Sequence, residues 1–174
     1  MIHRFTKESG ALLIIDMQER LASAMAPEQL ANVVQRIRAA IVGAKALGLP
    51  MVVTEQYPKG LGKTLPQISE LMTDFAPIEK IEFSGLVKPV RQCLSARPNV
   101  LVVGMETHVC VFQTVRSLKD AGLSPYVAAD AVLSRTPVDR SVGIDLCRGA
   151  GAHVTTIEAV LFDALGRAGT PEFK

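Results

Sequence analysis

Cys110 is the residue of this chain best suited to nucleophilic chemistry. It comes after a β-branched apolar run, residues 99–103, and just before apolar residues at helical spacing. With Thr107 as the expected N-cap, the thiol lies on the first turn of a helix. Unpaired backbone N–H groups and the positive end of the helix dipole favour the thiolate there. The alternative is an unreactive thiol packed as a small hydrophobic residue.

Asp16 is the candidate for a base that accepts the thiol proton. It directly follows a continuous apolar run, residues 11–15, which is too short for a helix and typical of a buried strand. Ligands of parallel α/β sheets bind at the carboxyl ends of the strands, and a carboxylate at such an end is well placed for acid–base chemistry. The alternative is an aspartate that caps the following turn.

An ammonium group near the thiol would lower the thiol pKa by stabilising the negative charge, and Lys80 is a candidate for this role. Residues 78–85 have no clean period and fit a short edge strand or an extended loop. A lysine between two glutamates is more often a solvated surface charge. The residues alone do not favour Lys80 over the other lysines.

Strand-like and helix-like segments alternate along the chain. Expected strands cover residues 11–15, 51–54, 99–103, 124–129 and 153–156, and expected helices cover residues 27–47, 66–72, 84–94, 108–121, 137–148 and 157–165. This alternation predicts an α/β protein with three α/β/α layers and a doubly wound, mostly parallel sheet, in a single domain spanning residues 1–174. In such a sheet the first and third long strands can be neighbours, which brings Asp16 and Cys110 together.

Composition narrows the classes of protein. The chain has 174 residues, 48% of them hydrophobic, and a net charge of +2 with both signs interspersed, so neither a nucleic-acid nor a membrane partner is indicated. No apolar run has the length of a membrane span, and no signal peptide is recognised. The three cysteines lie far apart, which favours a reducing, cytoplasmic location over disulfides or a zinc site.

A nucleotide site is not indicated. Gly62-Lys63-Thr64 follows the second expected strand, but Tyr57 stands where a phosphate loop needs glycine, and Pro66 soon interrupts the helix that should follow. No GxGxxG follows any strand. The segment is therefore interpreted as a surface loop or the rim of a site.

Three motifs, in this order, resemble the isochorismatase-like cysteine hydrolases, a family that includes nicotinamidases and N-carbamoylsarcosine amidohydrolases. They are Ile14-Ile15-Asp16-Met17-Gln18, Lys80 before Phe83-Ser84, and Gly104-Met105-Glu106-Thr107-His108-Val109-Cys110-Val111. The resemblance covers about residues 11–165. The loop of residues 54–62, with Asp130-Ala131 and Ser134-Arg135, is especially similar to the isochorismatase domain-containing branch, which has no well-defined substrate.

The resemblance implies a Cys-Asp-Lys triad. Cys110 would be the nucleophile, Asp16 the base for the thiol and later for water, and Lys80 the cation that holds the thiolate. A cis peptide bond between Met105 and Glu106 would aim the Glu106 backbone N–H, together with that of Cys110, into an oxyanion hole. The implied reaction is hydrolysis of a C–N bond, of amide or carbamoyl type, in a small molecule through a thioester.

Departures from the family restrict the substrate. Nicotinamidases bind a divalent metal through an aspartate and histidines after the second strand, where this chain has Gln56-Tyr57-Pro58 and no histidine. No metal and no other cofactor are therefore expected, and nicotinamide is a doubtful substrate. True isochorismatases lack the cysteine, so isochorismate is a weaker candidate. Five residues are expected to line the substrate pocket: Gln18, Gln56, Tyr57, Phe83 and His108.

Two further expectations concern partners and alternatives. The family implies a homo-oligomer, a dimer or a tetramer, that binds a small-molecule substrate. The alternative function is a catalytically idle hydrolase fold kept as a binding or scaffold protein. Cys93 and Cys147 fall on helices and are expected to be core thiols. Alkylation of Cys110 that is much faster than that of the other two would favour the enzyme.

Overall fold

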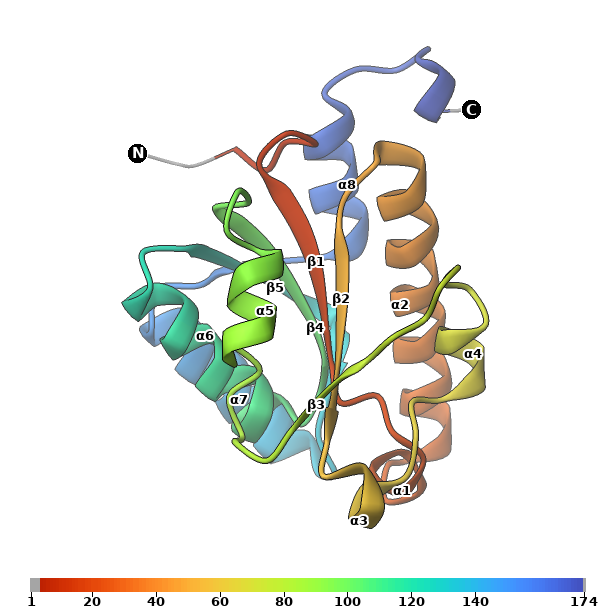
Figure 1. Ribbon diagram of the computed structural model, residues 1–174, viewed down its shortest axis with the longest axis vertical. Helices are drawn as coiled ribbons and strands as arrows, with labels where there is room; N and C mark the ends of the chain where they lie inside the picture. The colour runs from red at the N-terminus through yellow and green to blue at the C-terminus, as the bar shows by residue number, and fades with distance from the viewer. Residues whose placement is uncertain (1–3, 174) are drawn as a thin grey trace.

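A six-stranded sheet forms the centre of the computed structural model, which describes residues 4–173 (Figure 1). The strands are β1 (Gly10–Ile15), β2 (Met51–Gln56), β3 (Ile78–Lys80), β4 (Asn99–Met105), β5 (Ser124–Leu133) and β6 (His153–Thr155). Their order is β3-β2-β1-β4-β5-β6, and every pairing is parallel. The first strand thus lies inside the sheet, β2 and β3 extend the sheet to one edge, and β4, β5 and β6 extend it to the other edge. The predicted doubly wound fold is therefore confirmed.

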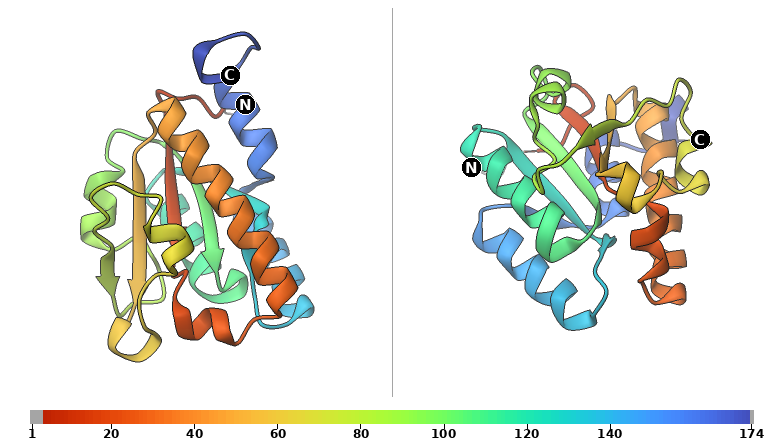
Figure 2. Two further views of the ribbon diagram at one scale, coloured as in Figure 1. Left: turned by 90° about the vertical axis from the view of Figure 1, so that its right-hand side faces the viewer. Right: turned by 60° about the horizontal axis from the view of Figure 1, so that its bottom comes forward.

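Helices cover both faces of the sheet (Figures 1 and 2). On one side lie α2 (Pro27–Leu47) and α8 (Ile157–Leu165), and on the other lie α5 (Lys88–Cys93), α6 (Phe112–Asp120) and α7 (Pro137–Gly149). The short elements are α1 (Glu19–Ser23), α3 (Pro58–Leu61), α4 (Pro66–Ser69), a π-helical turn η1 (Thr107–Val111) and a 3-10 turn η2 (Pro171–Phe173). In residues 4–173 no helix is long and apolar enough to cross a membrane.

The apolar run in β1 is continuous because both of its faces are covered. Leu12 and Ile14 pack toward α2 and α8, whereas Leu13 and Ile15 pack toward α5, α6 and α7. All four side chains are fully buried. Each such side chain contributes about 1.5–3 kcal/mol of hydrophobic free energy, which holds the central strand, and the residue that follows it, in one place.

Helix ends follow the capping residues read from the sequence. Pro27 lies in the first turn of α2, and Gly48 ends this helix in the left-handed conformation, with φ of 65°. At the start of α7 the Thr136 hydroxyl accepts a hydrogen bond of 3.1 Å from the backbone N–H of Asp139. The predicted starts of both helices are therefore confirmed.

Other boundaries differ from the predictions. β5 continues through Asp130 to Leu133, because its register with β4 shifts between Val102 and Gly104 and the ladder then resumes. The helix expected over residues 84–94 begins only at Lys88. Residues 19–23 and 58–61 form short helices that the apolar pattern did not indicate.

Candidate active site

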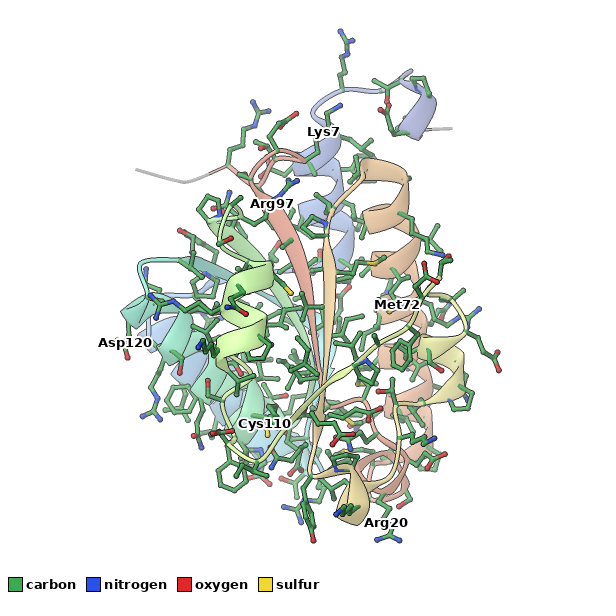
Figure 3. All side chains as sticks on the ribbon, viewed as in Figure 1. Lys7, Arg20, Met72, Arg97, Cys110 and Asp120 are labelled. Atoms are coloured by element: carbon green, nitrogen blue, oxygen red, sulfur yellow. The ribbon has the colours of Figure 1, made fainter. Side chains whose placement is uncertain are left out.

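Four neighbouring strands end at the same edge of the sheet. Asp16 follows β1, Gln56 ends β2, Lys80 ends β3 and Met105 ends β4. Parallel strands bring their carboxyl ends to one edge, and the order β3-β2-β1-β4 makes these four ends neighbours. Cys110 lies at this edge, at the bottom of the view in Figure 3.

Asp16 and Lys80 form a buried ion pair. The Lys80 Nζ lies 2.7 Å from Asp16 Oδ2, and both side chains are fully buried. The interpretation of Lys80 as a solvated surface charge is therefore wrong. Asp16 adopts a left-handed backbone conformation, with φ of 49°, at the point where the chain leaves β1. A buried charge pair of this kind needs further hydrogen bonds to offset its desolvation.

β2 supplies those hydrogen bonds from alternate positions. The Thr54 hydroxyl donates to Asp16 Oδ1 at 2.7 Å, and the Gln56 Oε1 accepts from Lys80 Nζ at 2.7 Å. Residues two apart in a strand face the same side of the sheet, so one strand can hold both members of the pair. Thr54 was not among the predicted site residues; its available signal was a polar residue near the end of a buried strand, beside a candidate base.

The ammonium of Lys80 has more acceptors than protons. Besides Asp16 and Gln56 it lies 3.2 Å from the carbonyl oxygen of Glu82 and 3.3 Å from that of Phe83. A lysine has three N–H donors, and four acceptors surround them. Lys80 therefore holds the loop after β3 against the site in addition to pairing with Asp16.

Cys110 lies beside this pair with an exposed fraction of 5%. Burial, followed by the negative charge of Asp16, raises the pKa of the thiol to about 12, and the charge of Lys80 lowers it only in part. A hydrogen-bond interaction with the Asp16 carboxylate further favours the protonated form. Burial and the adjacent carboxylate therefore favour the protonated thiol, whereas the helix start was expected to favour the thiolate.

The helix start itself differs from the prediction. Cys110 lies in the π-helical turn η1, in which the backbone N–H of Val111 donates to the carbonyl of Glu106 at 3.2 Å. Thr107 does not cap this turn: its hydroxyl is buried and has no hydrogen-bond partner in the described part of the chain. The turn is instead tied at its backbone, since the N–H of Thr107 donates to the Ser134 hydroxyl at 3.1 Å.

The chain approaches Cys110 through a compact stretch of backbone. Gly104 has φ of 118°, and a Cβ at this position would lie 2.0 Å from the carbonyl oxygen of Ile15, so only glycine fits between β1 and β4. The peptide bond between Met105 and Glu106 is cis, at the position that the family resemblance implied. Beyond the thiol, the Thr114 hydroxyl donates to the carbonyl of Cys110 at 2.6 Å.

The side chain of Glu106 forms a second ion pair near the thiol. Its Oε1 accepts from the Arg135 Nε at 2.9 Å and from the Arg135 backbone N–H at 3.2 Å. The carboxylate is nearly buried, and its negative charge also raises the pKa of Cys110. Glu106 was predicted to act through its backbone alone, and Arg135 was not predicted to belong to the site.

Gln18 was expected to line the substrate pocket, but its side chain forms hydrogen bonds with the protein backbone. Its Oε1 accepts from the backbone N–H of Gln56 at 2.7 Å, and its Nε2 donates to the carbonyls of Gln56 and Gly62 at 3.1 and 2.7 Å. The side chain is fully buried. Gln56 is similarly occupied, because its Nε2 donates to the Ile81 carbonyl at 2.9 Å while its Oε1 binds Lys80.

The other three expected pocket residues differ in their exposure. Tyr57 and Phe83 are exposed, and His108 is partly buried with its Nδ1 3.0 Å from the Ser134 hydroxyl. A cavity of about 410 Å³ lies beside β3. It is lined by Tyr57, Pro58, Lys59, Glu79, Lys80, Ile81 and Glu82, so neither Asp16 nor Cys110 forms its wall.

The remaining cysteines differ from one another. Cys147 is buried, as predicted, and burial raises the pKa of its thiol to about 12. Cys93 is exposed near the end of α5, so its predicted place in the core is wrong. Within residues 4–173 no cluster of three or more His, Cys, Asp or Glu side chains could hold a metal ion.

Known proteins are similar to this chain over most of its length. The family model described as Isochorismatase domain matches residues 10–159. A secreted isochorismatase effector, Isc1, of Phytophthora sojae is 37% identical, covering 98% of this chain and 84% of the relative. Isochorismatase domain-containing protein 2 of Bos taurus is 38% identical, covering 95% of this chain and 80% of the relative.

A solved structure shares both sequence and architecture. The MAR1 ribonuclease from Caenorhabditis elegans is 38% identical and superposes with a TM-score of 0.93, covering 98% of this chain and 88% of that chain. The family match spans β1 through the first residues of α8, and it includes every residue of the buried cluster around Cys110. This chain belongs to the isochorismatase family.

Proposed function

We propose that this protein is a cysteine hydrolase that cleaves a C–N bond, of amide or carbamoyl type, in a small molecule through a covalent thioester. The observation that carries the proposal is the buried Asp16–Lys80 pair, 2.7 Å apart, beside the thiol of Cys110. Such a group holds a nucleophile, a proton acceptor and a fixed positive charge in one place. We propose that residues 1–174 form one catalytic domain.

In the first half of the reaction the Cys110 sulfur attacks the substrate carbonyl carbon as its proton passes to the Asp16 carboxylate. The carbonyl oxygen becomes an oxyanion that accepts hydrogen bonds from the backbone N–H groups of Glu106 and Cys110. The C–N bond then breaks, and the leaving nitrogen takes the proton from Asp16. Ammonia or an amine departs, and an acyl or carbamoyl thioester remains on the sulfur.

In the second half a water molecule replaces the amine. Asp16 accepts a proton from the water, whose oxygen attacks the thioester carbon and forms a second oxyanion at the same donors. The C–S bond breaks, the sulfur recovers its proton from Asp16, and the acid product leaves. Lys80 keeps the Asp16 carboxylate in place in both halves of the reaction.

The raised pKa of the thiol is compatible with this sequence of steps. Because the pKa of Cys110 is about 12, the sulfur carries its proton until a substrate arrives. The proton then moves to a carboxylate that is already adjacent, so no free thiolate has to accumulate next to Asp16. The proton transfer and the attack on the carbonyl therefore belong to one step.

A substrate screen tests the proposal. Small amides, ureido acids and carbamoyl compounds are incubated with the protein, and ammonia release is measured against the Cys110→Ala variant. The expected result is release that depends on Cys110, with a thioester on that residue detectable by mass spectrometry after acid quenching. Release that persists in the variant, or a thioester on Cys93, would contradict the proposed nucleophile.

One observation favours a second function, that of a binding or scaffold protein with an idle site. Cys110 has an exposed fraction of only 5%, and the cavity beside β3 does not reach it. A protein of this kind would bind small amides without forming a thioester. Tight binding of a screened compound in calorimetry, with no covalent adduct and no ammonia, would favour this function over the hydrolase.

We also propose that the protein is a cytoplasmic homo-oligomer, a dimer or tetramer, without a nucleic-acid substrate. The net charge of +2 supports the last point, although the C. elegans structure is named a ribonuclease. Incubation with RNA alongside the amides tests it directly. Cell fractionation tests the location, since the Phytophthora relative is named a secreted effector.

A further inference from the structure

We infer that Arg135 forms an anion-binding rim for the Cys110 site, so that the substrate is a small amide or carbamoyl compound that carries a carboxylate. This inference rests on the proposed function and specifies its substrate class. Its basis is the way Glu106 holds the guanidinium beside the site.

The fold places Arg135 next to the segment that carries Cys110. β5 pairs with β4 up to Met105 opposite Leu133. Glu106 directly follows Met105, the last residue of β4. Arg135 lies two residues after Leu133, the last residue of β5. The two chain segments leave the sheet together at the edge where Asp16 and Lys80 lie. Arg135 therefore belongs to the same end of the molecule as the thiol.

The contacts of Arg135 leave the two terminal nitrogens of its guanidinium group available for hydrogen bonds to a ligand. One oxygen of Glu106, Oε1, accepts from both the backbone N–H and the Nε of Arg135. Among residues 4–173 no hydrogen-bond partner is found for the Nη1 and Nη2 groups, and the side chain is 58% exposed. A guanidinium presents its N–H groups in a planar fork that matches the two oxygens of a carboxylate.

Glu106 fixes this guanidinium relative to the sulfur. The Glu106 side chain is only 8% exposed, and its backbone lies between the cis peptide bond and the turn that holds Cys110. Its charge contributes to the raised pKa of Cys110, which places the carboxylate within electrostatic range of the thiol. A cation anchored on such a residue has a restricted position, so it can orient a substrate as well as attract one.

The other cation of the site is not available for this role. Lys80 is fully buried and already has four acceptors, including the Asp16 carboxylate. An additional anion at Lys80 would have to displace one of them. Arg135 is therefore the cation near Cys110 that can receive a substrate carboxylate without breaking an existing contact.

Alkylation of Cys110 with two reagents tests the inference without any substrate. Iodoacetate carries a carboxylate and iodoacetamide is neutral, and both transfer a similar group to sulfur. The rate ratio of the two at Cys110, measured at one pH by peptide mass spectrometry, cancels changes in the thiolate fraction. We expect Arg135→Gln to lower the iodoacetate-to-iodoacetamide ratio by roughly threefold to tenfold, and Arg135→Lys to lower it less.

Two controls separate local recognition from overall charge. Arg167→Gln removes the same charge beyond α8, where Arg167 lines a hollow with Lys7 and Leu47, and should leave the ratio unchanged. Figure 3 shows Lys7 and Cys110 toward opposite ends of the molecule. The Glu106→Gln/Arg135→Gln double variant has the net charge of the native protein, so its ratio should stay low if Arg135 itself contacts the anion. A ratio restored to the native value in the double variant would overturn the inference.

The outcome is independent of turnover. If compounds are hydrolysed at Cys110 but the ratio does not respond to Arg135→Gln, the hydrolase stands and the anion rim is wrong. If the ratio falls but no compound is hydrolysed, the anion rim stands and the hydrolase is wrong. In a positive screen, Arg135→Gln should raise KM for carboxylate-bearing amides far more than for neutral ones.

Discussion

The ammonium of Lys80 and the carboxylate of Asp16 lie 2.7 Å apart, although the two residues are separated by 64 positions in the chain. Both side chains are fully buried, and β2 contributes Thr54 and Gln56 to hold them. Three adjacent strands therefore cooperate in keeping two opposite charges inside the protein. The pair has consequences for stability as well as for chemistry, because either charge alone would be costly to bury.

Replacing Lys80 with methionine should destabilise the fold strongly. The Asp16 carboxylate would remain buried without its counter-charge, which typically costs about 3–5 kcal/mol. Urea unfolding measures the loss in the free energy of unfolding. The Asp16→Asn/Lys80→Met double variant should recover much of this stability while remaining inactive. A double variant that is no more stable than the single one would argue against the pair as the cause.

Thr54→Val should impair catalysis while Thr54→Ser should not. Valine has nearly the same shape but cannot donate to Asp16 Oδ1, whereas serine can. Leaving that buried oxygen without its donor costs about 1–3 kcal/mol, and the carboxylate loses its fixed orientation. Measurement of kcat and KM on any compound found in the screen should show the loss mainly in kcat. Equal activity of the two variants would show that Thr54 does not position the base.

The labelling of Cys110 should keep increasing with pH well above the ordinary thiol range. Its pKa is raised from 9.0 to about 12, so the thiolate fraction, and with it the iodoacetamide rate, rises until the pH approaches the higher value. Asp16→Asn removes the negative charge and the acceptor that raise this pKa, and the rate profile should shift to lower pH while hydrolysis is lost.

Peptide mass spectrometry resolves Cys110 from the other two cysteines in this experiment. Cys93, exposed on α5, supplies an internal rate that Asp16→Asn should not change. Cys147, buried on the same side of the sheet, should label slowly in both proteins. A native Cys110 profile that levels off near pH 9 would contradict the raised pKa.

The outer face of α7 should contribute to the proposed oligomer. Val138, Val142 and Leu146 recur at intervals of four and are 70%, 48% and 42% exposed. Beside them a groove between α6 and α7 is lined by Arg116 and Asp145, which carry opposite charges. Two copies related by a twofold axis could pair these charges reciprocally. We therefore expect Val142→Glu to reduce the mass measured by light scattering.

Charge exchange provides a sharper form of this experiment. Arg116→Asp and Asp145→Arg should each weaken the association, because each places like charges across the axis, and the double variant should restore it. Val42→Glu, on the exposed side of α2, is the matched control and should leave the mass unchanged. Single variants that both keep the native mass would exclude this face, and a double variant that fails to restore the mass would contradict the reciprocal charge pairing.

Much of the fold could be predicted because it depends on local patterns. Apolar runs such as residues 11–15 indicate buried parallel strands, and Pro27, Gly48 and Thr136 mark helix ends through their own backbone and side-chain chemistry. The failures occurred where distant contacts override the local pattern. β5 passes Asp130 because pairing with β4 continues, and Cys93 is exposed because α5 turns that position outward.

By itself the sequence determined the order of the main strands and helices, the apolar faces, and the presence of a carboxylate and a thiol near expected strand ends, while it left Lys80 as one candidate among the lysines. Only the tertiary structure decided which of these groups meet, because the contact between residues 16 and 80, and the approach of residue 110 to that pair, depend on strand order and register. The same holds for the protonation of Cys110. A thiol pKa follows from burial and from charges that are distant in the chain, and these exist only once the sheet has formed.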